Sequence, residues 1–419
     1  MTEHSFKSEF LRTLQERGFI HQSTDAEALD TLAAAGMITG YIGFDATASS
    51  LHAGSLVQIM LLYWLQQTGH KPIVLMGGGT TKVGDPTFKD TQRPLLTDEQ
   101  IQSNMDGIKR VFTNFLKFGD SGNDAIMVNN DDWLSGFGYV EFLRTFGTHF
   151  TINRMLTFDS VKLRLDREQP MTFLEFNYML MQAVDFRELN EKYNCVLQMG
   201  GSDQWGNIIN GVELTRRMNQ KQAFGLTTPL LTTASGGKMG KTASGAVWLN
   251  ADSLSSDDYW QYWRNTEDAD VGRFLRLFTT IPIEEIKRLE KLQGAELNDA
   301  KKQLAVAVTT MVHGKEAALS AQSKAERRFE RGEIELQIVS FNWTGIDGTY
   351  TIRTPEALVK EAGIALSMKE AKRFISNGEV TINGTVVSES HRFELKDVDP
   401  EKGGFVIKKG KKNILLTPE

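Results

Sequence analysis

The first 250 residues alternate short apolar runs with helical patterns, and this alternation limits the possible folds more than any other feature. The runs that suit strands each end near Gly, Asn or Asp, and they cover residues 38–44, 72–77, 125–129 and 195–200. Helical patterns lie between and after them, at residues 54–68, 98–116, 138–146, 172–193 and 203–219. Such alternation predicts an α/β domain with a doubly wound parallel sheet. Ligands of these sheets bind at the carboxyl ends of the strands.

Length and composition narrow the class of protein. The chain has 419 residues, which is enough for two to three domains of about 150 residues each. With 40% hydrophobic and 24% charged residues, it is neither disordered nor a rod. The net charge of −6 means that any nucleic-acid site must be local. A single cysteine, Cys195, excludes a disulfide framework and a zinc site built from cysteines.

The N-terminal stretch does not read as a targeting signal. Residues 1–19 carry Glu3, Glu9 and Glu16 and lack a continuous apolar run, unlike signal and transit peptides. No window approaches the roughly 18 apolar residues that a membrane span needs. We therefore expect a cytoplasmic protein.

Composition also divides the chain into segments. We expect a catalytic domain at residues 1–250, a helical, charge-rich domain at 251–335, a linker at 336–353 and a small domain at 354–419. Over residues 402–419 five lysines stand against one acidic side chain, on a chain that is acidic overall.

Residues 52–55 read His-Ala-Gly-Ser and directly precede an apolar helical stretch. A helix start offers unpaired amide donors and the positive end of its dipole, which suits phosphate. His52 can donate to a phosphate or ribose oxygen, and Gly54 lets a ligand approach the backbone. A helix cap with an incidental histidine explains this short pattern equally well.

Residues 236–242 read Gly-Gly-Lys-Met-Gly-Lys-Thr. Lys238 and Lys241, in a glycine-rich segment, can close over a polyphosphate and compensate charge on a leaving pyrophosphate. Two lysines at this spacing are by themselves more often a solvated loop, and the segment is not a P-loop at a strand-to-helix turn.

Two further segments carry more polar side chains than their expected secondary structure needs. Residues 200–207 (Gly-Gly-Ser-Asp-Gln-Trp-Gly-Asn) end an expected strand and open a helix, and a well-capped turn does not explain their density of polar groups. Tyr178, Gln182 and Asp185 share one face of a helix rich in Met and Leu. A buried polar face is costly unless satisfied, although a solvent-facing stripe is the commoner cause of such spacing.

Together, in this order, the patterns resemble the class I aminoacyl-tRNA synthetases. Residues 46–55 resemble their HIGH motif and residues 238–242 their KMSKS motif. The bacterial tyrosyl-tRNA synthetases of this class are the closer resemblance, from about residue 5 to the end. Further matching motifs stand in the same order, at residues 41–52, 84–86, 129–133, 176–178, 182–186 and 200–207. Ser55 departs from the usual His or Asn of the HIGH motif, and Gly240 replaces the KMSKS serine.

The resemblance implies a fold and a reaction. The fold is a Rossmann-like catalytic domain, followed by a helical domain and a small α+β RNA-binding domain. The reaction activates L-tyrosine with ATP to tyrosyl-adenylate and pyrophosphate, then transfers tyrosine to the 3′ end of tRNA(Tyr). Mg²⁺ would arrive with ATP, held largely by phosphates and water, and no protein-bound metal is expected. A homodimer is implied as well, and residues 137–150 are a candidate interface or, equally, buried core.

The resemblance also implies the role of individual residues. The catalytic group is His52, Ser55, Lys238, Lys241 and Thr242. The ATP-binding group is Asp45, Thr47, His52, Gly54, Lys89, Arg93, Gly201, Asp203 and Lys241. The tyrosine-binding group is Tyr41, Asp85, Tyr178, Gln182, Asp185 and Gln204, with Tyr41 and Asp185 at the phenol hydroxyl.

The C-terminal segment favours an RNA partner. Residues 367–384 read as helix, turn and strand, and they resemble a small RNA-binding domain shared with a ribosomal protein. Lys369, Lys372 and Arg373 cluster on the helix and are expected to contact phosphates, although charge alone suits a solvated helix.

Two alternative functions for the whole chain are a tryptophanyl-tRNA synthetase and an inactive RNA-binding relative. A nicotinamide dehydrogenase is disfavoured because no G-x-G-x-x-G follows the first strand.

Overall fold

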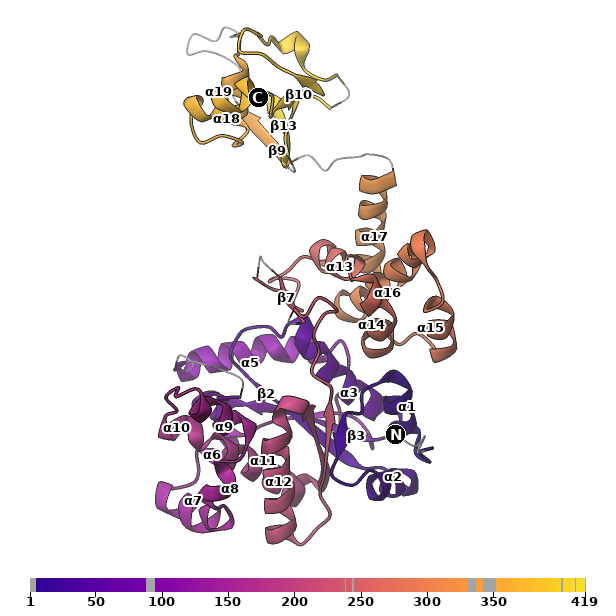
Figure 1. Cartoon of the computed structure of the whole chain (residues 1–419), viewed down its shortest axis with the longest axis vertical. Coiled ribbons are helices and arrows are strands. Elements are labelled where there is room, and N and C mark those ends of the chain that lie inside the picture. Colours follow the sequence, from indigo (N-terminus) through magenta and orange to yellow (C-terminus); the bar gives the residue numbers. More distant parts are fainter. Residues whose placement is uncertain are drawn as a thin grey trace. The chain divides into compact units, whose positions relative to one another are not determined.

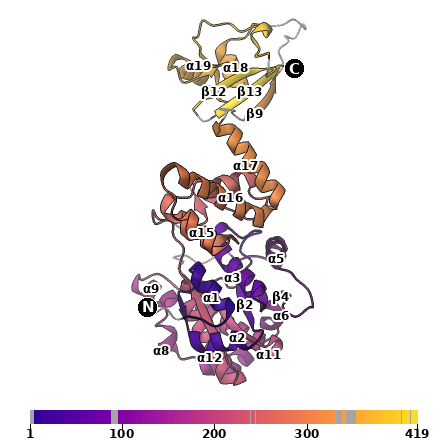
Figure 2. The same cartoon turned by 90° about the vertical axis from the view of Figure 1, so that its right-hand side faces the viewer.

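The structure is a computed structural model of the whole chain (Figure 1, Figure 2). The described residues are 5–87, 95–237, 239–242, 245–330, 337–341, 352–400, 402–410 and 412–418. They form two compact units, Met1–Gln322 and Ser323–Glu419. Within the described ranges, none of the helices is long and apolar enough to cross a membrane.

A six-stranded sheet forms the centre of the first unit, with the strand order β1-β6-β5-β2-β3-β4. The strands are β1 (Gln22–Ser23), β2 (Thr39–Asp45), β3 (Lys71–Gly77), β4 (Ile126–Asn129), β5 (Cys195–Gly201) and β6 (Phe224–Thr228). All neighbours pair in parallel except β1 with β6. This confirms the doubly wound parallel sheet, and β1 and β6 add strands that the sequence patterns did not indicate. The winding reverses between β2 and β5.

Helices cover both faces of this sheet. A side chain added at Gly40 of β2 would meet Leu65 of α3 (Leu56–Gln67), so α3 lies on that face. The next residue, Tyr41, points to the opposite face, where its ring packs 5.4 Å from Phe186 of α11 (Tyr178–Tyr193). Helix α12 (Trp205–Asn219) lies beside α11, and its Gly211 faces Gln198 of β5. The carboxyl ends of β2 and β5 therefore open between these layers.

Nine further helices of the described residues belong to this part of the chain. They are α1 (Glu9–Arg17), α2 (Ala26–Ala35), α4 (Gly78–Thr81), α5 (Asp98–Phe112), α6 (Asp131–Leu134), α7 (Tyr139–Thr145), α8 (Ile152–Met155), α9 (Asp159–Asp166) and α10 (Phe173–Phe176). The helix expected at residues 172–193 is two helices, α10 and α11, which meet at Asn177. The helix expected at residues 54–68 opens with the 3₁₀ turn Ala53–Ser55 before α3.

A helical region follows the sheet in the chain and gathers into one body in Figure 1. Its helices are α13 (Ser256–Arg264), α14 (Val271–Phe278), α15 (Ile283–Leu289), α16 (Leu297–His313) and α17 (Lys315–Glu330). Helices α16 and α17 are separated by Gly314, where φ is +88°. Arg17 of α1 donates to the carbonyl oxygens of Arg276, Thr279 and Ile281 after α14. The sheet and most of this helical region thus form one compact unit, where the sequence suggested two domains.

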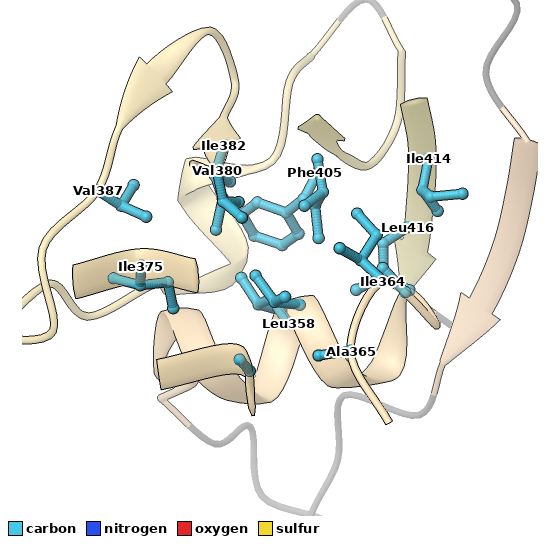
Figure 3. Close-up of a cluster of buried hydrophobic side chains, with 14 of the residues drawn as sticks. Leu358, Ile364, Ala365, Ile375, Val380, Ile382, Val387, Phe405, Ile414 and Leu416 are labelled. Atoms are coloured by element: carbon cyan, nitrogen blue, oxygen red, sulfur yellow. The ribbon is translucent and has the colours of Figure 1, made fainter. Parts of the chain in front are cut away.

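The second unit is a small α+β fold with a five-stranded sheet, in the order β11-β10-β12-β13-β9. Its elements are β9 (Gln337–Phe341), α18 (Pro355–Glu361), α19 (Met368–Ser376), β10 (Thr381–Ile382), β11 (Thr385–Val386), β12 (Phe405–Lys409) and β13 (Lys412–Pro418). Figure 3 shows Leu358 and Ile375 of the helices facing Phe405 and Leu416 of the sheet.

The start of the second sheet corrects one expected boundary. Strand β9 pairs in parallel with β13, although residues 336–353 were expected to form a linker. Val339 pairs with Leu416 and packs against the apolar core of this unit, which is why this stretch joins the sheet. Residues 342–351 of the expected linker lie outside the described residues.

Candidate active site

A cavity of about 310 Å³ opens at the carboxyl ends of β2 and β5, where the winding of the sheet reverses. Its wall contains most of the residues that sequence analysis singled out for tyrosine and ATP. Those on the wall are Tyr41, Asp45, Thr47, His52, Ser55, Asp85, Tyr178, Gln182, Asp185 and Gln204. The polar face of α11 therefore points into a cavity and is not a solvent-facing stripe.

Three described residues of the predicted set, Gly54, Gly201 and Asp203, are not on this wall. A side chain at Gly201 would lie 2.4 Å from the Oδ1 atom of Asp203, and Asp203 lines a neighbouring cavity of about 440 Å³. Gly54 packs against the backbone of Met239. Lys89, Arg93 and Lys238 lie outside the described residues. The backbone of Lys241 and Thr242 forms β7, which pairs with β8 (Gly245–Ala246).

Tyr41 and Asp185 form a buried polar pair in the cavity, 1% and 2% exposed. Asp185 is held by two donors, Asn130 Nδ2 to Oδ2 and Trp133 Nε1 to Oδ1, each at 2.9 Å. Burial raises the pKa of Asp185 to about 8, although these two hydrogen bonds oppose the shift. The Tyr41 hydroxyl is buried and has no hydrogen-bond partner among the described residues. A ligand hydroxyl would satisfy it.

Asn130 and Trp133 received no role from the sequence, although both stand in one of the matching motifs. Asn130 Nδ2 also donates to Thr80 Oγ1 at 3.0 Å, and Asn130 Oδ1 accepts from the backbone amide of Gly79 at 2.8 Å. These bonds fix the amide side chain beneath Asp185. Nothing in their spacing predicted this contact, because β4 and α11 become neighbours only when the sheet has formed.

Two further carboxylates line the cavity. Asp45 accepts hydrogen bonds from Tyr178 at 3.1 Å and Thr80 at 2.8 Å, and Asp85 accepts one from Gln204 Nε2 at 2.8 Å. Burial raises the pKa of Tyr178 well above its usual value, and Asp45 and Asp85 add to the shift. The phenol therefore stays protonated as a donor. This concentration of acceptors suits a ligand that carries an ammonium group.

Buried amide oxygens point to a ligand as well. The Oε1 atoms of Gln182 and Gln198, both on residues of the cavity wall, lack a partner within the described part of the chain. Buried polar atoms in proteins are normally paired, so unpaired ones at a cavity mark groups that a ligand satisfies.

The HIGH-like and KMSKS-like segments meet in space. The amide of Ala53 donates to Val247 at 2.8 Å, and the amide of Leu249 donates to Leu51 at 2.9 Å. A side chain at Gly240 would lie 2.4 Å from the amide nitrogen of Gly54. Gly240 also has a φ of +78°, which favours glycine. These two constraints give a physical reason for glycine in place of the KMSKS serine.

The imidazole of His52 is oriented by its own loop. Its Nδ1 atom accepts from the amide of Gly54 at 3.0 Å, so in the neutral ring the proton is on Nε2. Ser55 lines the same cavity at the start of α3, and its side chain makes no capping hydrogen bond. Donors of His52, Ser55 and the start of α3 thus stand together where a phosphate group would bind.

No group of three or more His, Cys, Asp or Glu residues suited to a metal ion occurs in the ranges that the structure describes.

The predicted RNA-binding residues are exposed on α19 of the second unit. Lys372 pairs with Glu389 at 2.9 Å, and Arg373 lies 3.9 Å from Glu370. Exposed pairs of this kind are weak, so both cations stay available to a phosphate. Lys369 lies in the first turn of the same helix.

Known proteins resemble this chain along its whole length. The family model described as tRNA synthetases class I (W and Y) matches residues 34–330, and the S4 domain model matches residues 357–399. With the doubly wound sheet and the two meeting motifs, this match defines a class I aminoacyl-tRNA synthetase.

The relatives narrow the class. A tyrosine–tRNA ligase of Caulobacter vibrioides is 62% identical over 98% of both chains, and one of Mesorhizobium japonicum is 56% identical over 99% of both. A C-terminally truncated mitochondrial tyrosyl-tRNA synthetase of Aspergillus nidulans is 31% identical, with a TM-score of 0.70 over 77% of this chain and 94% of that chain. The chain belongs to the tyrosine–tRNA ligase family, which confirms the resemblance found in the sequence.

Proposed function

We propose that this chain joins L-tyrosine to tRNA(Tyr) in two steps, through a tyrosyl-adenylate. The observation that carries the proposal is the buried Tyr41 hydroxyl, unpartnered among the described residues, beside Asp185 in a cavity that His52 and Ser55 also line. The phenol hydroxyl of tyrosine would bind Tyr41 and Asp185, and nucleotide phosphates would bind His52 and Ser55. One cavity then holds both substrates of the first step.

Tyrosine is recognised at both of its polar ends. Tyr41 and Asp185 bind the phenol hydroxyl. Asp85, Tyr178 and Gln182 bind the ammonium group, and Gln204 lies on the carboxylate side. Phenylalanine would leave the buried Tyr41 hydroxyl unpaired and would bring no donor to Asp185, and an unpaired buried hydroxyl costs more than its hydrogen bond contributes.

In the first step, a carboxylate oxygen of tyrosine attacks the α-phosphorus of ATP, and the bond to the pyrophosphate oxygen breaks. The substrate brings its own nucleophile, so the protein contributes position and charge. His52, Gly54 and Ser55 bind the phosphates. Lys238, Lys241 and Thr242, with Lys89 and Arg93, stabilise the leaving pyrophosphate. Asp45, Thr47, Gly201 and Asp203 bind the adenosine of the adenylate. Mg²⁺ comes with ATP and is held largely by phosphate oxygens and water.

In the second step, a ribose hydroxyl of the terminal adenosine of tRNA attacks the tyrosyl carbonyl, and AMP leaves. We assign catalysis to residues 1–250, the anticodon-stem side to residues 251–335 and further RNA contacts to residues 354–419. Lys369, Lys372 and Arg373 on α19 meet RNA phosphates. Charged tRNA is used in translation, so the enzyme works in the cytoplasm.

We also propose a homodimer. In residues 137–150, Phe146 is buried and packs 5.2 Å from Phe142, so part of this stretch is core. Tyr139 and Val140 on α7 are 65% and 66% exposed. Two large apolar side chains side by side on one helix suit a second copy of the chain.

Exchange of labelled pyrophosphate into ATP tests the reaction and the substrate together. We expect exchange with tyrosine and none with tryptophan or phenylalanine. Asp185→Ala should lose the preference for tyrosine over phenylalanine. Exchange with tryptophan would indicate a tryptophanyl enzyme. Exchange with no amino acid would leave a non-catalytic RNA-binding role as the better explanation.

A further inference from the structure

Helix α13 of the helical region contacts the KMSKS-like segment through one hydroxyl group. Tyr262 Oη donates to the Sδ atom of Met239 at 3.3 Å and accepts from the amide of Gly240 at 3.4 Å. Burial raises the pKa of Tyr262, so its proton stays in place as the donor to sulfur. Met239 and Gly240 are the two residues between Lys238 and Lys241, so the contact is made in the middle of the motif.

The contact continues into the HIGH-like segment. Met239 is 5% exposed, and a side chain at Gly54 would lie 2.7 Å from its carbonyl oxygen. Gly240 lies against the amide of Gly54 in the same way. A contact that holds Met239 and Gly240 in place therefore also sets the position of the KMSKS-like segment relative to Gly54.

The chain that leads into the motif is anchored to the same helical region. The amide of Ala234 donates to Asp270 Oδ2 at 2.8 Å, and the hydroxyl of Ser235 donates to Glu267 Oε1 at 2.6 Å. The helical region thus holds both the approach to the motif and its middle. Of these described contacts, the one made by Tyr262 reaches Met239 and Gly240, the residues that lie against Gly54.

We propose that Tyr262 is a positioning residue for adenylate formation. Its hydroxyl holds Met239 and Gly240, the middle of the KMSKS-like motif, against Gly54 of the HIGH-like motif. Holding the segment before ATP binds removes conformational freedom that would otherwise be lost during the reaction. The inference rests on the proposed function, because it concerns the same step.

Tyr262→Phe tests this directly, since it removes the hydroxyl and keeps the ring that packs on Trp263. We expect single-turnover adenylate formation, per titrated active site, to slow by about 3- to 10-fold, the rate equivalent of one net hydrogen bond. The KM for tyrosine and the thermal midpoint should stay at the parent values. A residue that only supports the fold would instead lower the thermal midpoint and the number of active sites.

Tyr259→Phe is the matched control. It removes the same atom from the same helix, one turn away, where the ring packs against Trp263 and His313. This variant should keep the parent rate. Met239→Leu removes the sulfur acceptor at nearly constant volume, and the double variant with Tyr262→Phe should be no slower than Tyr262→Phe alone.

A parent rate in Tyr262→Phe, an equal loss in Tyr259→Phe, or additive losses in the double variant would overturn the role of Tyr262 and leave the proposed function intact. A parent enzyme without tyrosine-dependent pyrophosphate exchange would overturn both. Should Tyr262→Phe fold poorly, Met239→Leu tests the same contact from the other side, and a parent rate in that variant refutes it.

Discussion

Removing the hydroxyl of Tyr41 should have opposite effects on stability and on substrate binding. In the ligand-free protein this hydroxyl is buried and has no hydrogen-bond partner among the described residues. Tyr41→Phe keeps the ring that packs 5.4 Å from Phe186, so the change deletes one unsatisfied polar atom. The same atom is the proposed partner of the substrate phenol. The variant therefore separates the effect of the hydroxyl on protein stability from its effect on substrate binding.

The magnitudes follow from the burial of the group. An unsatisfied buried donor costs about 1–3 kcal/mol, so the ligand-free variant should be more stable than the parent by up to that amount. A net hydrogen bond contributes about 1 kcal/mol, so tyrosine should bind roughly fivefold more weakly. Phenylalanine makes no such bond and should bind at least as well as to the parent. Discrimination between the two amino acids should fall about fivefold or more.

Calorimetric unfolding of the ligand-free protein and equilibrium binding of tyrosine and phenylalanine measure both effects. Tyr259→Phe, a buried tyrosine of α13 that is not on the cavity wall, serves as the control for discrimination. A ligand-free Tyr41→Phe protein less stable than the parent would refute the unpaired state of the hydroxyl. Unchanged discrimination would refute its contact with the substrate.

Three other predictions concern charge, backbone space and catalysis. The pKa of Asp185 is about 8 in the folded protein, against an ordinary value of 3.8. As pH rises, the unfolded chain therefore loses the Asp185 proton before the folded protein does. The free energy of unfolding should fall as pH rises from about 4 to about 8. Asp185→Asn removes this cost, so its stability relative to the parent should grow over that window in urea unfolding, and a pH-independent difference would contradict the shift. Gly240→Ser restores the KMSKS serine, but it places Cβ 2.4 Å from the amide nitrogen of Gly54, at a φ of +78°. Adenylate formation should therefore slow about tenfold or more. An unchanged rate would show that the backbone at Gly54 and Gly240 moves apart without loss of function. Lys241→Ala should slow single-turnover adenylate formation by about 10²–10³-fold, as for one lost transition-state donor, and an unchanged rate would remove Lys241 from the catalytic group.

Much of the fold could be predicted because its signals are local. The apolar runs at residues 38–44 and 72–77 correspond to β2 and β3 within one residue at each end. Strand β6 was missed, although all five of its residues are buried, because two of its five residues are Thr and one is Gly. Strand β9 lies where the sequence predicts a linker, because its pairing partner β13 is at the far end of the chain.

The candidate site divides in the same way. The order of the motifs was sufficient to name ten of the residues that line the cavity, because each motif is a short pattern at a strand end or helix start. The support of Asp185 by Asn130 and Trp133 was not predictable, since three segments must first converge.

Residue periodicity and short motifs depend only on neighbours along the chain, so the sequence alone was enough to predict the doubly wound architecture and the family. Three features depend on the tertiary structure instead: the Tyr41 hydroxyl lacks a hydrogen-bond partner among the described residues, Gly54 and Gly240 leave no room for a side chain between them, and Tyr262 reaches Met239 of the KMSKS-like segment. Each of these depends on distances between residues far apart in sequence. The order of the strands and the packing of the helices set those distances.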